Sequence, residues 1–155
     1  MRNNKSLAVL VFSLTVCPMV DGLIPQTYSR EVGWEEKEID WDRFLKALAQ
    51  MESGGLADPD AAVGDDGAAI GRYQIHEVCW IDAALGDGEY TDCHKADYAA
   101  RVVKAYLIRY GRKQIHSGDV EALARKWNGG GPKGDTKKAT EKYGQKFRKI
   151  WDSLA

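Results

Sequence analysis

Glycines interrupt this 155-residue chain often enough to rule out a long continuous helix. They follow apolar segments at Gly54-Gly55, Gly86 and Gly111, and the sequence Gly-Gly-Gly-Pro occupies 129–132. Glycine commonly ends a helix, and proline cannot continue one. The chain is therefore predicted to form several short helices rather than a coiled coil.

The segments between these glycines have the spacing of amphipathic helices. Asp40 is a suitable N-cap for a first helix, in which Trp41, Leu45, Leu48 and Glu52 share one face and which Gly54 ends. Further helices are expected over 76–85, 95–110 and 119–127, with a last one that starts near 136.

The segment 56–72 is the exception to the helical pattern. It contains Asp58-Pro59 and then Gly64-Asp65-Asp66-Gly67, and an Asp-Gly pair is a signal for a tight turn between two strands. A small hairpin fits this segment. The predicted fold class is thus α+β and mostly helical, with one small β element.

The first 22 residues have the order of a secretory signal peptide. Arg2 and Lys5 precede the apolar run 7–16, which is shorter than the ~20 residues that a permanent membrane span requires. We expect cleavage near Gly22 and export to a secreted or periplasmic location, with no stable membrane anchor afterwards. A buried N-terminal helix is the alternative. Residues 23–38 are predicted to be an N-terminal arm or linker, and 39–155 the functional domain.

Composition and charge exclude several classes of protein. With 44% hydrophobic and 29% charged residues, the chain fits a single soluble domain of roughly 150 residues. Its net charge of −1 argues against a polycation built for nucleic acid. The charge is divided, however: 23–100 holds 6 basic and 17 acidic residues, and 101–155 holds 14 basic and 5 acidic. The basic half could meet an anionic polymer, although internal pairing is the simpler explanation for most of these charges.

Two cysteines remain after removal of the first 22 residues. Because an exported protein folds in an oxidising compartment, Cys79 and Cys93 are predicted to form one disulfide. A zinc site that adds His76 and His94 is the alternative, but the adjacent Cys93 and His94 suit a tetrahedral site poorly. We therefore expect no metal and no cofactor.

Glu52 is the strongest candidate for chemistry. It lies on the apolar stripe of the first helix, in its last turn, where apolar surroundings and the helix dipole both disfavour a carboxylate. Such a group suits a general acid, although a structural ion pair would also explain it. Asp65 and Asp66 lie on the Gly-flanked turn, which a hairpin could fold back toward the helix end. Two carboxylates across a cleft would suit glycoside hydrolysis, whereas turn chemistry alone also favours Asp.

Three motifs in this order resemble the lysozyme-like superfamily. They are Met-Glu-Ser-Gly at 51–54, Gly-Arg-Tyr-Gln-Ile-His-Glu-Val-Cys-Trp-Ile-Asp at 71–82 and Ala-Arg-Lys-Trp-Asn-Gly-Gly at 124–130. The chain is similar to the invertebrate-type (i-type) lysozymes and, more distantly, to goose-type lysozymes and lytic transglycosylases. This resemblance implies a lysozyme-like fold with a small β-hairpin or sheet beside the catalytic cleft.

The resemblance also implies roles for particular residues. Glu52 matches the catalytic proton donor and Asp65 the second acidic residue, with Asp66 as a close competitor. The positions expected to bind substrate are Tyr73, Gln74, His76, Asn128 and Gly129. One departure is the cysteine content, because i-type lysozymes are rich in cysteine and this domain has two.

The implied function is a monomeric muramidase that cleaves the β-1,4 bond between N-acetylmuramic acid and N-acetylglucosamine in peptidoglycan. Its partners would be glycan strands, with no role for nucleic acid. One alternative is a lytic transglycosylase, which needs essentially one Glu and leaves 1,6-anhydro ends. The other is a catalytically silent glycan-binding or inhibitor-like module on the same scaffold.

Overall fold

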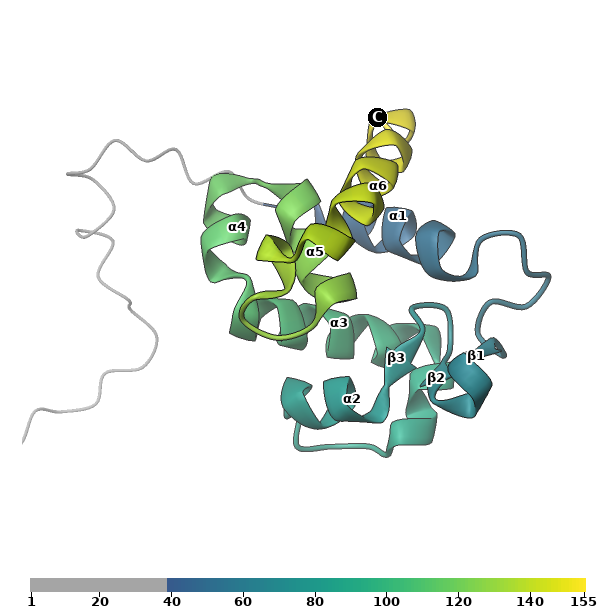
Figure 1. The fold of residues 1–155 in the computed structure, drawn as a ribbon. Helices are drawn as coiled ribbons and strands as arrows, with labels where there is room; N and C mark the ends of the chain where they lie inside the picture. The colour runs from purple at the N-terminus through teal and green to yellow at the C-terminus, as the bar shows by residue number, and fades with distance from the viewer. Residues whose placement is uncertain (1–38) are drawn as a thin grey trace, which may run out of the picture. The chain divides into compact units, whose positions relative to one another are not determined.

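The computed structural model describes residues 39–155 (Figure 1). The expected signal peptide at 1–22 and the arm at 23–38 lie outside the described residues. The helices are α1 (Trp41–Ser53), α2 (Glu77–Ala83), α3 (Ala96–Tyr110), α4 (Arg112–Ser117), α5 (Val120–Gly129) and α6 (Glu141–Ser153). Short 3-10 turns occupy Asp65–Gly67, Tyr90–His94, Gly134–Thr136 and Lys138–Thr140.

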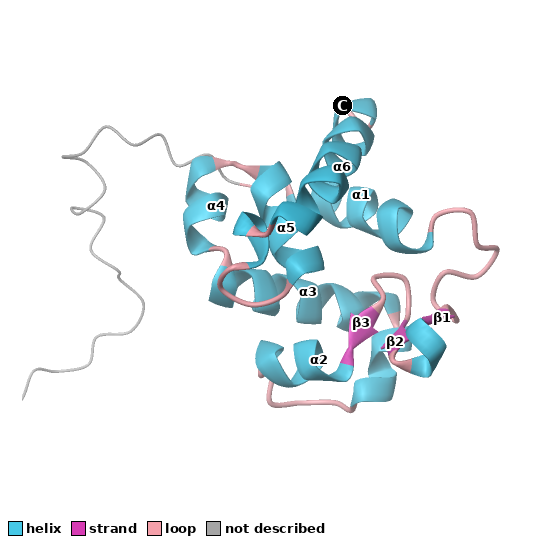
Figure 2. Ribbon diagram, in the orientation of Figure 1, coloured by secondary structure: helices cyan, strands magenta, loops and turns pink. Residues whose placement is uncertain are grey.

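Three two-residue strands complete the fold. They are β1 (Val63–Gly64), β2 (Ala69–Ile70) and β3 (Ile75–His76), which pair antiparallel in the order β1-β2-β3. Figure 2 shows them grouped beside α2 and below the C-terminal end of α1. The prediction of a mostly helical α+β fold with a small β element is therefore confirmed.

Side-chain caps mark the starts of two of the helices, α1 and α5. The Asp40 side chain accepts a hydrogen bond from the Arg43 amide at 3.0 Å, and Asp119 does the same for Ala122 at 3.0 Å. These caps satisfy amides that a helix start leaves without partners. One expectation was wrong: the last helix starts at Glu141 rather than near 136, because two 3-10 turns precede it.

Positive backbone angles shape the β element. The turn between β1 and β2 places Asp65 and Asp66 in the left-handed region, at φ values of 48° and 54°. Gly71 has φ 70°, and a Cβ there would collide with the carbonyl oxygen of Cys93. Only glycine fits at this position, and the close approach brings the sheet against the 3-10 turn at 90–94.

The hydrophobic core joins α1 to α3, α5 and α6. The Phe44 ring of α1 and the Phe147 ring of α6 are both fully buried, and their centroids are 4.9 Å apart. Leu48, Leu107 and Leu123 are equally buried. This contact sets the position of α1 against α6 and thereby places the C-terminal end of α1. No helix within 39–155 is long and apolar enough to cross a membrane.

We expect Phe44→Ala to destabilise the protein by about 3–5 kcal/mol, because it removes a fully buried ring and leaves a cavity against Phe147. Urea unfolding followed by circular dichroism measures this change. Ile108→Ala, at a side chain that is 47% exposed on α3, is the control and should change the free energy of unfolding by no more than about 0.5 kcal/mol. Equal losses in the two variants would contradict the assignment of Phe44 to the core.

Candidate active site

A cleft of about 550 Å³ lies where the end of α1, the sheet, α2 and the end of α5 meet. Its lining residues are Glu52, Asp65, Gln74, His76, Val78, Cys79, Asp82, Tyr106, Trp127, Asn128, Gly129 and Gly130. Six of the residues singled out from the sequence thus share one cavity, although they are spread over 78 positions of the chain: Glu52, Asp65, Gln74, His76, Asn128 and Gly129.

Glu52 is held in place by the residue that follows it. The Ser53 side chain is buried, and its hydroxyl lies within hydrogen-bonding distance of the carbonyl oxygens of Ala49 (3.1 Å) and Arg72 (2.9 Å). The first contact is within the helix, and the second reaches the turn between β2 and β3. Ser53 therefore connects the end of α1 to the β element by a hydrogen bond. This contact fixes the orientation of the last turn of α1, from which the Glu52 side chain extends.

Tyr143 of α6 completes the surroundings of Glu52. Its hydroxyl donates a hydrogen bond of 2.5 Å to the Glu52 Oε1 atom. Burial raises the pKa of Glu52, and hydrogen bonds from Tyr143 and Trp127 lower it in part, while the Asp65 charge raises it again. The net direction is upward, as a proton donor near neutral pH requires. Burial and the nearby Glu52 carboxylate also raise the pKa of Tyr143, so the phenol keeps the proton that it donates.

The structure distinguishes Asp65 from Asp66. Asp65 lines the cleft, and its Oδ2 atom lies 2.9 Å from His76 Nε2. Asp66 is exposed and does not line the cleft. Both residues have left-handed backbone angles, which Asp tolerates in turns, so the backbone does not distinguish them and the side-chain positions do.

Asn128 and Gly129 form the opposite wall of the cleft together with Trp127. The Trp127 ring packs edge-on against Tyr106, with centroids 5.6 Å apart. The Tyr106 hydroxyl accepts a hydrogen bond of 2.6 Å from the Gly131 amide. Tyr106 therefore holds the glycine segment at one end, just beyond the cleft.

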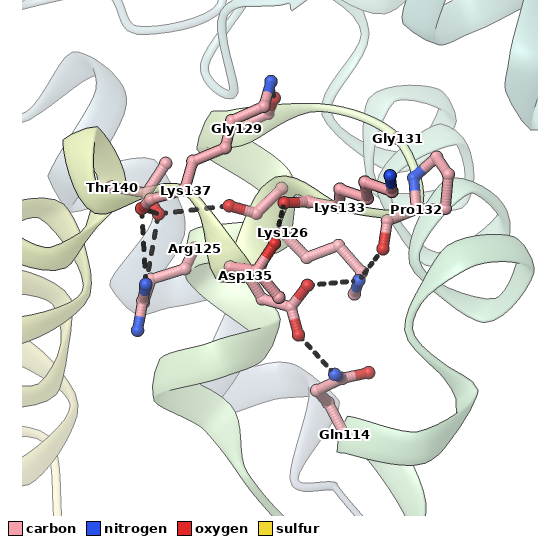
Figure 3. A network of polar contacts seen from close by, with 12 residues as sticks. Gln114, Arg125, Lys126, Gly129, Gly131, Pro132, Lys133, Asp135, Lys137 and Thr140 are labelled. Carbon is pink, nitrogen blue, oxygen red and sulfur yellow. Dashed lines mark hydrogen bonds and ion pairs between the residues drawn. The ribbon is translucent and has the colours of Figure 1, made fainter.

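A buried polar network holds the same segment from below (Figure 3). Lys126 is 2% exposed, and its ammonium donates to Asp135 Oδ1 at 2.6 Å and to the Pro132 carbonyl at 2.9 Å. Gln114 of α4 donates to the other Asp135 oxygen at 2.6 Å. Each buried charge thus has partners, which keeps a loop of glycines in one conformation without apolar side chains.

One predicted substrate-binding residue lies away from the cleft. Tyr73 does not line the cleft: the residue is 4% exposed and belongs to the hydrophobic core, which is not where a substrate-binding ring was expected. Gln74, its neighbour, takes the cleft position, with φ 49° and a hydrogen bond from Nε2 to the Gly71 carbonyl. The positive φ of Gln74 changes the direction of the chain after Tyr73. The alternation of side chains along a regular strand would not predict this change.

The sequence motifs did not predict that Tyr143 and Trp127 donate hydrogen bonds to Glu52. Nor did they place Tyr106 and Asp82 in the cleft; Asp82 accepts a hydrogen bond of 3.0 Å from the Tyr110 hydroxyl. The spacing of these residues along their helices predicts which residues share a helix face. It does not predict which residue of another helix lies across the cleft.

Comparison with known proteins decides the family. A lysozyme of the clam Meretrix lusoria is 30% identical over 109 residues, which cover 70% of this chain and 88% of that protein. A lysozyme of Ostrea edulis is 32% identical over 104 residues, 66% of this chain and 74% of the relative. The chain belongs to the invertebrate-type lysozyme family.

Further comparisons agree with this lysozyme assignment. Lysozyme 1 of Crassostrea virginica is 36% identical over 76 residues, although the match spans only 41% of that protein. The crystal structure of inhibitor-bound Meretrix lusoria lysozyme superposes with a TM-score of 0.57 at 30% identity, over 70% of this chain and 88% of that one. The same lysozyme in complex with Aeromonas hydrophila PliI gives 0.58. No family model matches the sequence. The chain is thus a glycosidase of the lysozyme type.

The cysteines of this lysozyme differ from the expectation of a disulfide. Cys79 and Cys93 are both free thiols in the structure. Burial raises the pKa of both, that of Cys93 to about 11, which disfavours the reactive thiolate. Cys79 packs against the hydrophobic core that contains Cys93, and oxidation of the two thiols to a disulfide stays a prediction.

The histidines of the alternative zinc site have other partners. His76 pairs with Asp65, and His94 Nδ1 lies 2.6 Å from the Asp60 carbonyl oxygen. Across residues 39–155 no three His, Cys, Asp or Glu side chains gather in a way that would hold a metal ion.

We expect Tyr143→Phe to raise the pKa of Glu52 further, because the variant loses a hydrogen bond that lowers this pKa. A pH titration of the Glu52 side-chain carboxyl carbon by NMR measures the shift. Tyr110→Phe is the matched control, since it removes a hydroxyl that donates to Asp82 instead. An unchanged or lower Glu52 pKa in Tyr143→Phe would contradict the proposed contact.

Proposed function

We propose that this lysozyme-family protein is a muramidase. It hydrolyses the β-1,4 bond between N-acetylmuramic acid and N-acetylglucosamine in peptidoglycan, with Glu52 as the general acid. The observation that carries this proposal is the cleft itself, in which a half-buried carboxyl of raised pKa faces a second carboxylate, Asp65. A carboxyl of raised pKa beside an ionised one is the usual arrangement for glycoside hydrolysis.

The chemistry assigns different steps to the two carboxyl groups. Protonated Glu52 donates its proton to the glycosidic oxygen, which leaves as a hydroxyl. Asp65 stabilises the positive charge that develops on the muramic acid ring before water completes hydrolysis. His76, beside Asp65, holds the carboxylate in the cleft.

The walls of the cleft supply the sugar contacts. We assign Asn128 and Gly129 to the N-acetyl and hydroxyl groups of the glycan, because an amide and an exposed backbone supply both donors and acceptors there. Gln74 and His76 contribute side-chain groups from the opposite wall. The first 22 residues support a secreted or periplasmic site of action, where peptidoglycan is accessible.

A lytic transglycosylase is the second candidate, and one observation favours it. The Asp65 side chain is 70% exposed and engaged by His76, so its carboxylate is less confined than that of Glu52. If Asp65 served only the turn, the muramyl 6-hydroxyl would replace water and the product would carry a 1,6-anhydro end.

Mass spectrometry of the products from purified peptidoglycan tests the reaction. We expect reducing muramic acid ends and a fall in rate of about 10²–10⁴-fold for Glu52→Gln, which retains the shape of the side chain but cannot donate the proton. Circular dichroism confirms that the variant is folded. Anhydro ends would establish the transglycosylase instead, and normal turnover by folded Glu52→Gln would remove Glu52 from the mechanism.

Asp65→Asn and Asp66→Asn form a matched pair on one turn. We expect Asp65→Asn to lower kcat by about 10²-fold, because it removes a charge that stabilises the transition state. Asp66→Asn makes the same change outside the cleft and should leave kcat unchanged. Initial rates on soluble glycan strands measure both. The opposite order of effects would make Asp66 the second carboxylate.

A further inference from the structure

One face of α6 carries a row of lysines that the fold does not use. Lys142, Lys146 and Lys149 follow at helical spacing, and Lys138 precedes them in the adjoining 3-10 turn. All four side chains are exposed. We call these four residues the α6 lysine row.

The row has little opposing charge. Segment 137–149 contains six basic residues and one acidic residue, Glu141. The ion pairs found within 39–155 include none of the four lysines. Like charges one helical turn apart destabilise a helix by a few tenths of a kcal/mol, so the row works slightly against α6. Within 39–155, ion pairing therefore does not account for the row, and its four cations are available to an anionic ligand.

The row begins next to the cleft and is fixed relative to it. The Lys137 ammonium donates to the carbonyl of Gly129, a residue of the cleft wall (Figure 3). Arg125 donates to the Lys137 carbonyl at 3.3 Å and to the Thr140 hydroxyl at 3.2 Å, immediately before α6. Tyr143, which follows Lys142 by one residue, leaves α6 at about a right angle to the lysine face and reaches Glu52. One helix thus presents the contact to Glu52 on one face and three lysines on an adjacent face.

We propose that the α6 lysine row binds a phosphodiester polymer of the bacterial wall while the cleft holds the glycan. This proposal rests on the proposed muramidase function. A rise of about 1.5 Å per residue places the backbone positions of Lys142, Lys146 and Lys149 about 4.5–6 Å apart along α6, a series of cations that can meet successive phosphates of such a polymer.

The rest of the charge distribution favours this orientation. Residues 39–100 contain 13 acidic and 4 basic residues, and the cleft itself contains Glu52, Asp65 and Asp82. A polyanion is repelled from that side and from the cleft, and it is attracted to α6. Binding there holds the enzyme on a wall that also contains its glycan, which raises the effective concentration of substrate at the cleft.

Co-sedimentation of the protein with purified bacterial cell walls tests whether the α6 lysine row binds the phosphodiester polymer. The protein is used as Glu52→Gln so that the walls stay intact, and the walls are taken before and after hydrofluoric acid extraction, which removes phosphodiester polymers and leaves peptidoglycan. The row variant is Lys142→Gln/Lys146→Gln/Lys149→Gln. The control is Lys46→Gln/Arg112→Gln/Lys113→Gln, which removes the same charge from exposed positions elsewhere.

We expect strong binding to intact walls, weaker binding after extraction, and loss of that difference in the row variant only. The slope of log K against log salt should be shallower by roughly 2 in the row variant, about 0.7 for each of three lost phosphate contacts. Equal binding by the row and control variants would overturn the proposal, as would binding that extraction does not change. Row-dependent binding to duplex DNA as tight as to intact walls would overturn the assignment to a wall polymer.

A second arm separates this proposal from the proposed function. With Glu52 restored, the native, row and control proteins should turn over phosphate-free soluble glycan strands at the same rate. Absence of turnover in the native protein would contradict the muramidase, whereas the wall-binding result would remain interpretable. A lower rate in the row variant on these strands would place the lysines at the glycan and so overturn the row as a separate site.

Discussion

The contact between α1 and α6 is the constraint on which the site depends. Phe44 and Phe147 bury their rings against each other, and this packing brings the C-terminal end of one helix beside a tyrosine of the other. The hydrogen bond from Tyr143 to Glu52 follows from that alignment, although the two residues are 91 positions apart. Ser53 adds a second anchor by reaching the turn at Arg72. Glu52 is therefore held by two neighbouring elements, α6 and the β element, in addition to its own helix.

The same arrangement has a cost in stability. Burial raises the pKa of Glu52 above its ordinary value, so the folded protein holds a proton that the unfolded chain has already released. The contribution of protonated Glu52 to the free energy of unfolding is fully present below the ordinary pKa. It is lost as the pH rises through the raised pKa of the folded protein. Tyr143 and Trp127 limit this loss because their hydrogen bonds favour the carboxylate. The site thus combines burial, which favours the protonated carboxyl of Glu52, with hydrogen bonds that favour its carboxylate.

Local sequence rules predicted most of the helices and the position of Glu52, because caps such as Asp40 and stops such as Gly111 act on neighbouring residues. They could not predict that Tyr73 would be buried while Gln74 faces the cleft, since this depends on a left-handed residue within a short turn. Nor could they predict Tyr143 as the partner of Glu52. The motif identified one side of the contact, and tertiary packing supplied the other.

Ion pairs hold two loops of this domain, which has too few cysteines to fix its loops with several disulfides. Arg72 donates to both oxygens of Asp60, at 2.5 and 2.6 Å, and ties the long loop after α1 to the β element. The buried Lys126–Asp135 pair does the same for the glycine segment. A buried pair adds little net stability compared with apolar packing, but it accepts one geometry only. Lys126 directly precedes the cleft residue Trp127, and Arg72 lies two residues before the cleft residue Gln74, so both pairs act on segments that line the cleft.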